Sequence, residues 1–174
     1  MNSRQSDLNG TWEFCVNTCP DLDSAQFDSR IEVPSHAQLS IGVLPDGPAY
    51  YWYRRQLIVP NPEPHHQAVI MFGAADWHSD VWADDRLIAS NQGGYLPFEA
   101  VLPPELHGKS TTLTVRVWDA PLLPTQTVES PHGDSFDSVW LPRGKQHWYG
   151  ECSGIWQPIH LFVRPEARIG GVKT

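Results

Sequence analysis

Apolar and polar residues alternate with a period of two along much of the chain, which predicts β-strands. In the run 53–59, one face takes Tyr53, Arg55, Leu57 and Val59, and the other takes Arg54, Gln56 and Ile58. In the run 111–118, Leu113, Val115 and Val117 alternate in the same way with Thr112, Thr114 and Arg116. A third run spans 155–163, and Pro158 inside it predicts an edge strand or a bulge, because proline cannot donate to a ladder.

Other segments predict further strands. The continuous apolar run 67–72 is typical of a strand that is buried on both faces. Asp84-Asp85 lies between two short apolar runs and predicts a two-residue hairpin turn. Shorter strands are expected at 11–16, 31–33 and 98–102, and a single helical turn at 103–108. No segment has a sustained helical period, so we expect an all-β fold: a two-sheet antiparallel β-sandwich, of the jelly-roll or a similar type.

A long connection interrupts this pattern. Asp119 ends a predicted strand, and about 35 residues without a clear regular element separate it from Gly154. Loops of this length are uncommon in compact domains and are usually functional or disordered. Because this loop contains Phe136, Trp140, Trp148 and Tyr149, we expect it to be ordered and to pack over the sheet or contact a partner.

Composition narrows the class of protein. The chain has 174 residues, enough for one domain, and a formal net charge of −8 with no basic patch, which is unlike a nucleic-acid-binding protein. The N-terminal residues 1–10 are polar and resemble no signal peptide, and no apolar stretch approaches the ~18 residues of a membrane span. The three cysteines, Cys15, Cys19 and Cys152, form no disulfide framework. We therefore expect reduced thiols, a cytoplasmic location and no contact with nucleic acid or membrane.

Three clusters combine aromatic and hydrogen-bonding side chains, a mixture that suits a sugar. Their candidate substrate-binding residues are Asp76 and Trp77, then Gln92 and Tyr95, and then Arg143, Lys145, Gln146 and Trp148. The structural alternative is that these aromatic rings belong to the core. His65-His66 has no third metal ligand in view, and the carboxylates Asp134, Asp137 and Glu151 have no spacing that brings them together. We expect no catalytic residue, no metal site and no cofactor.

Eight short motifs follow one another in an order that resembles a known family. They are Leu8-Asn9-Gly10-Thr11-Trp12-Glu13-Phe14, Val33-Pro34-Ser35, Tyr53-Arg54-Arg55, Phe72-Gly73-Ala74-Ala75-Asp76-Trp77, Gly93-Gly94-Tyr95-Leu96-Pro97-Phe98-Glu99, Val115-Arg116-Val117, Trp148-Tyr149-Gly150 and Ser153-Gly154-Ile155-Trp156-Gln157-Pro158. Between Leu8 and about Pro165, the chain looks like the N-terminal sugar-binding domain of glycoside hydrolase family 2, the β-galactosidase and β-glucuronidase family. The resemblance implies a jelly-roll of the galactose-binding-domain type, and the fifth motif is closer to the β-glucuronidase branch.

The resemblance also implies where the chemistry lies. In this family the two catalytic glutamates belong to a C-terminal (β/α)₈ barrel that follows an immunoglobulin-like domain. Residues 1–168 would then form the sugar-binding domain, and 169–174 the linker or first strand of the immunoglobulin-like domain. The positions nearest the substrate pocket would be 46–50, including Asp46 and Tyr50, and the turn at 92–95. Ala37 stands where the family usually has an aromatic residue. Gly93-Gly94 replaces the acidic residue that in large β-galactosidases helps to bind sodium.

The resemblance predicts a non-catalytic sugar-binding or supporting domain of a retaining β-glycoside hydrolase, which hydrolyses O-glycosyl bonds in its complete form. Its partners would be a β-glycoside and the immunoglobulin-like and barrel domains of the same enzyme. Two alternatives stay open: a free-standing, lectin-like carbohydrate-binding module, and an interaction domain whose exposed aromatic side chains contact another protein.

Overall fold

The computed structural model describes residues 5–37, 41, 49–119, 127–129, 131, 133, 135–137 and 153–167. The strands are β1 (Gln5–Asp7), β2 (Gly10–Asn17), β3 (Ser29–Val33), β4 (Ala49–Ile58), β5 (His66–Phe72), β6 (His78–Ala83), β7 (Arg86–Gln92), β8 (Phe98–Val101), β9 (Ser110–Asp119), β10 (Thr127–Glu129), β11 (Ser135–Asp137) and β12 (Ile159–Pro165). Two short 3₁₀ turns are present, η1 (Leu22–Ser24) and η2 (Pro104–Leu106). The second of these is the single turn expected at 103–108.

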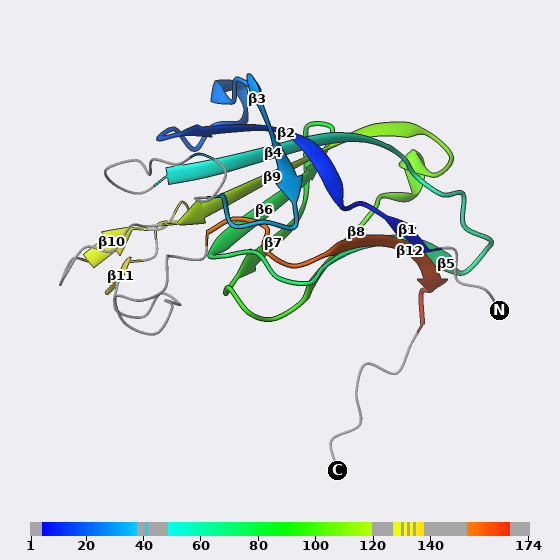
Figure 1. The fold of residues 1–174 in the computed structure, drawn as a ribbon. Helices are drawn as coiled ribbons and strands as arrows, with labels where there is room; N and C mark the ends of the chain where they lie inside the picture. The colour runs from blue at the N-terminus through cyan, green and yellow to red at the C-terminus, as the bar shows by residue number, and fades with distance from the viewer. Residues whose placement is uncertain are drawn as a thin grey trace, which may run out of the picture.

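The strands form two main antiparallel sheets (Figure 1). The small sheet has the order β1-β12-β5-β8, and the large sheet has the order β3-β2-β4-β9-β6-β7. A separate two-stranded sheet pairs β10 with β11. The all-β prediction of two antiparallel sheets is therefore confirmed.

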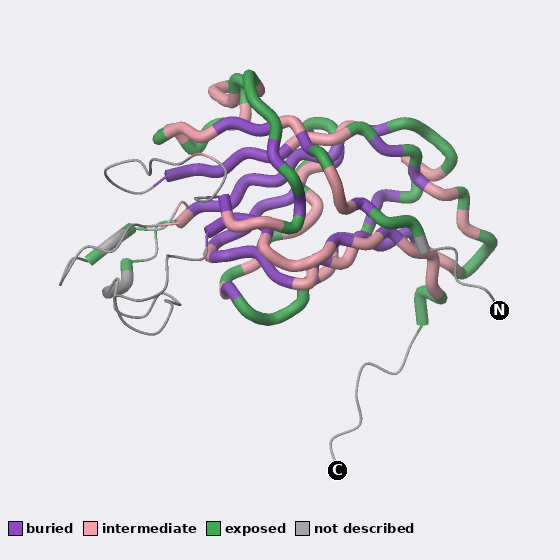
Figure 2. The backbone as a smooth tube through the Cα atoms, viewed as in Figure 1, coloured by how far each residue is buried: buried purple, intermediate pink, exposed green. Residues whose placement is uncertain are grey.

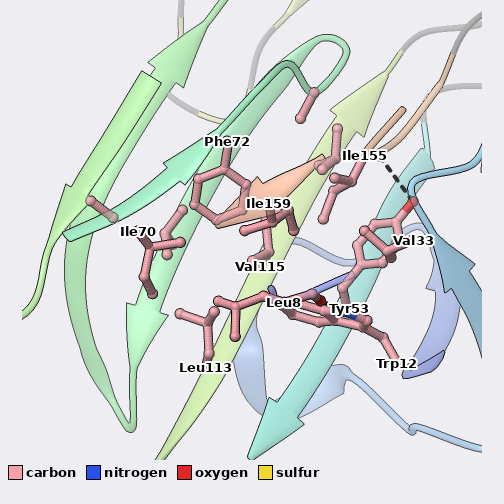
Figure 3. Close-up of a cluster of buried hydrophobic side chains, with 14 of the residues drawn as sticks. Leu8, Trp12, Val33, Tyr53, Ile70, Phe72, Leu113, Val115, Ile155 and Ile159 are labelled. Carbon is pink, nitrogen blue, oxygen red and sulfur yellow. Dashed lines mark hydrogen bonds between the residues drawn. The ribbon is translucent and has the colours of Figure 1, made fainter. Parts of the chain in front are cut away.

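The main core fills the space between the two sheets (Figure 3). It combines side chains of the small sheet, such as Phe72 and Ile159, with side chains of the large sheet, such as Tyr53 and Val115. Phe72 stacks on Phe98 at 4.6 Å between ring centroids. Burying each large side chain stabilises the fold by roughly 1.5–3 kcal/mol. Figure 2 shows that the buried residues are concentrated in inner strands such as β4, β6 and β9, whereas β7 and many of the connections are partly or fully exposed.

A second buried cluster covers the opposite face of the large sheet. It contains Cys15, Tyr50, Trp52 and Trp118. Leu22, Ala25 and Phe27, which pack against this cluster, lie in the connection between β2 and β3. We call residues 18–28 of this connection the strap. At this end of the large sheet, both faces are therefore buried.

Arg116 holds the strap to the sheet. Its guanidinium donates to Asp80 Oδ2 at 2.5 Å and to the carbonyl oxygen of Pro20 in the strap. It also lies 5.4 to 5.6 Å from the ring centroids of three aromatic side chains, Tyr50, Trp52 and Trp82. The alternation in 111–118 correctly separates Arg116 from the apolar face, but the strap and the aromatic rings bury that side chain as well.

The hairpin expected at Asp84-Asp85 is confirmed. Ala83 pairs with Arg86, which leaves two residues in the turn. Asp84 has a φ of 55°, in the left-handed region that aspartate tolerates better than most residues.

The strand predicted at 155–163 is wrong in its first half. Strand β12 begins at Ile159, immediately after Pro158, whose carbonyl accepts a hydrogen bond from the Gly73 amide at 2.8 Å. The strand is also not an edge strand, because it lies between β1 and β5. Proline therefore marks the start of an inner strand.

The long connection from Asp119 to Gly154 contains regular structure that the sequence did not predict. Strands β10 and β11 form a short antiparallel ladder in which Val128 pairs with Phe136. The expectation of no regular element is wrong for these residues. Trp140, Trp148 and Tyr149 lie outside the described residues.

Candidate functional site

One end of the large sheet collects most of the described candidate residues. Here β2 and β9 end, β4 and β6 begin, and β7 ends (Figure 1). The strand register places five residues in one row across the sheet, Asn17, Tyr50, Trp118, His78 and Gln92. Two predicted site residues, Tyr50 and Gln92, are in this row, and the predicted pair Asp76 and Trp77 directly precedes His78. We call this region the site end.

Tyr50 and Trp77 come together at the site end, but much of each ring is used in packing. Tyr50 is buried in the second cluster, and burial raises the pKa of its hydroxyl. Trp77 is partly buried and packs against the same cluster, and its backbone amide donates to the Trp118 carbonyl at 3.2 Å. The rings of Tyr50 and Trp77 therefore serve mainly in packing, in agreement with the alternative that these aromatic residues belong to the core.

Gln92 and Tyr95 are the exposed candidates. Gln92 ends β7 and is exposed, and Tyr95 in the following turn is 56% exposed. The next residue, Leu96, is 78% exposed. This turn therefore offers a flat ring and an amide side chain to solvent.

Tyr95 belongs to a group of three rings that the sequence did not predict. Trp156 lies parallel to His36, with centroids 6.3 Å apart and an interplanar angle of 11°. Tyr95 meets Trp156 edge-on at 5.9 Å, and the indole Nε1 of Trp156 donates to the Gly94 carbonyl at 2.8 Å. We call His36, Trp156 and Tyr95 the ring group. The sequence did not indicate the ring group, because the alternation in 155–163 predicted that Trp156 lies in a strand.

Asp76 is buried rather than exposed. Its residue is 2% accessible, and its backbone exchanges two hydrogen bonds with Gly154, at 3.0 and 2.9 Å. Burial, and secondarily the negative charge of Asp119, raises the pKa of Asp76 to about 8. Asp119 in turn accepts a hydrogen bond from Ser153 Oγ at 2.5 Å. In this conformation a ligand in solvent does not reach the Asp76 carboxyl.

The other five candidates, Asp46, Arg143, Lys145, Gln146 and Trp148, lie outside the described residues. Within the described ranges, no group of three or more His, Cys, Asp or Glu side chains is arranged to hold a metal ion. Cys15 and Cys19 are free thiols. Among the same residues, no helix has the length and apolar character of a membrane span.

Chemically, the site end combines exposed aromatic and amide groups with buried carboxyls. Aromatic faces pack on the C–H surface of a sugar, and amides bind its hydroxyls. A retaining glycosidase instead needs two carboxyls that face each other across an open cleft. The buried Asp76 does not meet that requirement.

Comparisons with known proteins agree with the motifs. No family model matches the chain. The β-glucuronidase of Paenibacillus borealis is 28% identical over 173 residues, which cover 90% of this chain and 28% of the relative. A solved β-glucuronidase from Faecalibacterium prausnitzii superimposes with a TM-score of 0.65 at 21% identity, covering 94% of this chain and 32% of that protein. A family 2 β-galacturonidase from Eisenbergiella tayi gives 0.62 at 17% identity, covering 92% of this chain and 24% of that protein.

The chain thus spans less than a third of the length of three curated β-glucuronidases that it matches. The solved structures share its fold at low sequence identity. Over at least 90% of its length, this chain is similar to one domain of the glycoside hydrolase family 2 enzymes, and its fold is the β-sandwich of their N-terminal domain.

Proposed function

We propose that the chain acts as a non-catalytic domain of a retaining β-glycoside hydrolase of the β-glucuronidase type. The observation that carries this proposal is coverage: the similarity extends over 90% of the chain but only 28% of the relative. Such a domain supports the catalytic part of the enzyme and helps to shape its sugar site, whereas the acid and the nucleophile come from another domain.

In this proposal, the exposed turn after β7 is the part of the site end that lies nearest the substrate. Gln92 and Tyr95 supply an amide and a ring there, and Tyr50 and Trp77 stiffen the sheet behind them. Asp46, Arg143, Lys145, Gln146 and Trp148 are further proposed contacts. The proposed partners are a β-glycoside and the immunoglobulin-like and barrel domains of the same enzyme, in a cytoplasmic protein.

An activity measurement tests the non-catalytic role. The purified 174-residue chain is incubated with p-nitrophenyl β-glucuronide and p-nitrophenyl β-galactoside, and release of p-nitrophenol is followed. We expect no release above the rate in buffer. Turnover by the chain that persists after a further purification step would overturn the proposal.

The coding sequence after Thr174 tests the supporting role. We expect it to continue in frame into an immunoglobulin-like domain and a (β/α)₈ barrel with two glutamates at its catalytic positions. A stop codon directly after Thr174, with no barrel encoded beside it, would contradict a role within one polypeptide.

A free-standing carbohydrate-binding module is the second candidate, and the exposure of Tyr95 beside Trp156 favours it. Calorimetric titration with glucuronic acid and galactose tests it. Saturable binding at millimolar concentration or below, lost in Tyr95→Ala but kept in the control Leu87→Ala, would support this module. Leu87 is a suitable control because it is also exposed, but at the start of β7, far along the strand from Gln92.

A further inference from the structure

The carboxyl of Asp76 lies directly beneath the backbone of the turn that carries Tyr95. A Cβ atom added at Gly94 would lie 2.5 Å from Asp76 Oδ1 and 2.6 Å from its Cγ. Real Cβ atoms essentially never make contacts below 3.0 Å, so with any other residue at position 94 the turn or the carboxyl would have to shift. The carboxyl and the turn are therefore packed against each other with no space between them.

Hydrogen bonds join three chain segments around this contact. Gly154 pairs with the Asp76 backbone, and the Gly93 amide donates to the Trp77 carbonyl at 3.1 Å. The Gly94 carbonyl accepts a hydrogen bond from the indole Nε1 of Trp156. Asp76 thus lies where the segment after β5, the turn after β7 and the segment before β12 meet, and two of these segments supply rings of the ring group.

Among the described residues, one oxygen of this carboxyl lacks a hydrogen-bond partner. Asp76 Oδ1 is buried without a hydrogen bond, and no ion pair of the described residues includes Asp76. A buried carboxylate without a donor is strongly disfavoured relative to the neutral acid. The side chain therefore fits its surroundings best when it is protonated.

Other titratable groups lie on the elements around Asp76. Asp119, at the end of β9, is negative and opposes it. The Tyr53 hydroxyl, from β4, lies beside Gly154, and burial keeps the pKa of that hydroxyl well above its usual value. His78 begins β6 two residues after Asp76, and Tyr95 follows Gly94 in the turn.

We propose that Asp76 is a positioning residue that works as a neutral acid: its protonated carboxyl supports the Gly93-Gly94 turn and so holds Tyr95 against Trp156. Loss of the proton places a charge beneath the turn, and the turn then separates from the segment below it. The ring group is consequently ordered at low and neutral pH and loosened in alkaline solution. That the ring group contacts a sugar rests on the proposed function, whereas its order and its pH dependence do not.

A pH titration of the folded chain tests this role. In ¹H–¹⁵N spectra between pH 5 and 10, the indole signal of Trp156, assigned with Trp156→Phe, should move with a midpoint near the Asp76 pKa of about 8. The variant Asp76→Asn, a neutral side chain of the same shape, should keep the pH 6 position over the whole range. Asp119→Asn should lower the midpoint by about one pH unit, because it removes a like charge.

The results decide the proposal either way. An unchanged titration in Asp76→Asn would show that another group is responsible and would overturn it. If Asp76→Asn does not fold, the ¹³C shift of the Asp76 carboxyl in the unmodified chain gives its midpoint directly, and a midpoint below pH 6 overturns the proposal. These readouts use no sugar. A negative result would therefore overturn the role of Asp76 but not the proposed function, and an absence of sugar binding would not affect the role of Asp76.

Discussion

Replacing Gly154 by alanine would place a methyl group where the structure has no room for one. Gly154 has a φ of +86°, and a Cβ atom there would overlap the Tyr53 hydroxyl oxygen and lie 3.1 Å from the Cβ of Ala37. The left-handed conformation costs a non-glycine residue about 1–2 kcal/mol. Overpacking a rigid interior adds about 1–3 kcal/mol. We therefore expect Gly154→Ala to lower the free energy of unfolding by about 2–5 kcal/mol, measured by urea denaturation.

Two comparisons separate these causes. Gly10 also has a positive φ, +104°, but an added Cβ atom would meet nothing within 4 Å. Gly10→Ala should therefore show only the conformational cost. Tyr53→Phe removes the overlapping oxygen, so in that background Gly154→Ala should cost about 1–3 kcal/mol less. The reasoning is refuted if Gly154→Ala costs no more than Gly10→Ala, or if the Tyr53→Phe background changes nothing.

The remaining predictions concern the second cluster. Arg116→Met removes the cation that is paired with the buried Asp80 carboxylate and should lower the free energy of unfolding by about 3–5 kcal/mol, whereas Arg86→Ala, which breaks an exposed ion pair, should cost about 1 kcal/mol or less. Equal losses in urea denaturation would contradict a buried role for Arg116. Burial raises the pKa of the Cys15 thiol, while Cys19 is partly exposed. With Ellman's reagent on the folded chain, Cys19→Ser should remove one rapidly reacting thiol and Cys15→Ser none.

The alternation of side chains predicted the sheets well because it reports directly which face a residue occupies. In β9, Leu113 and Val115 do face the main core as expected. The same pattern could not show that Arg116 is covered too, because its cover comes from the strap, almost a hundred residues earlier in the chain. Burial on the second face depends on tertiary contacts that a local pattern does not contain.

The strand predicted at 155–163 shows a different limit. Its residues alternate correctly, but Gly154 has a left-handed φ and Pro158 has no amide hydrogen to donate. Regular pairing therefore begins only at Ile159. Trp156 therefore lies before the strand, and its side chain packs in the ring group.

The candidate site could be predicted only in part for the same reason. Polar and aromatic residues that follow strands singled out Asp76 and Trp77 in one cluster and Gln92 and Tyr95 in another, and the structure brings both clusters to the site end. The sequence did not show that Asp76 is buried, because that burial results from the close approach of Gly94, eighteen positions away. It also did not show that His36 reaches Trp156 across most of the chain.

The small sheet brings the two ends of the described chain together. Strand β1 pairs with β12, so Ser6 lies opposite Leu161, and β12 separates β1 from β5 (Figure 1). During synthesis on a ribosome, β1 has no neighbour in this sheet until β12 has emerged. Contacts so distant in sequence form slowly, because a long loop must close first. The domain should consequently complete its fold only after almost all of it has been translated. Removal of β12 should leave β1 without its neighbour in this sheet and should remove Ile159 and Leu161 from the core.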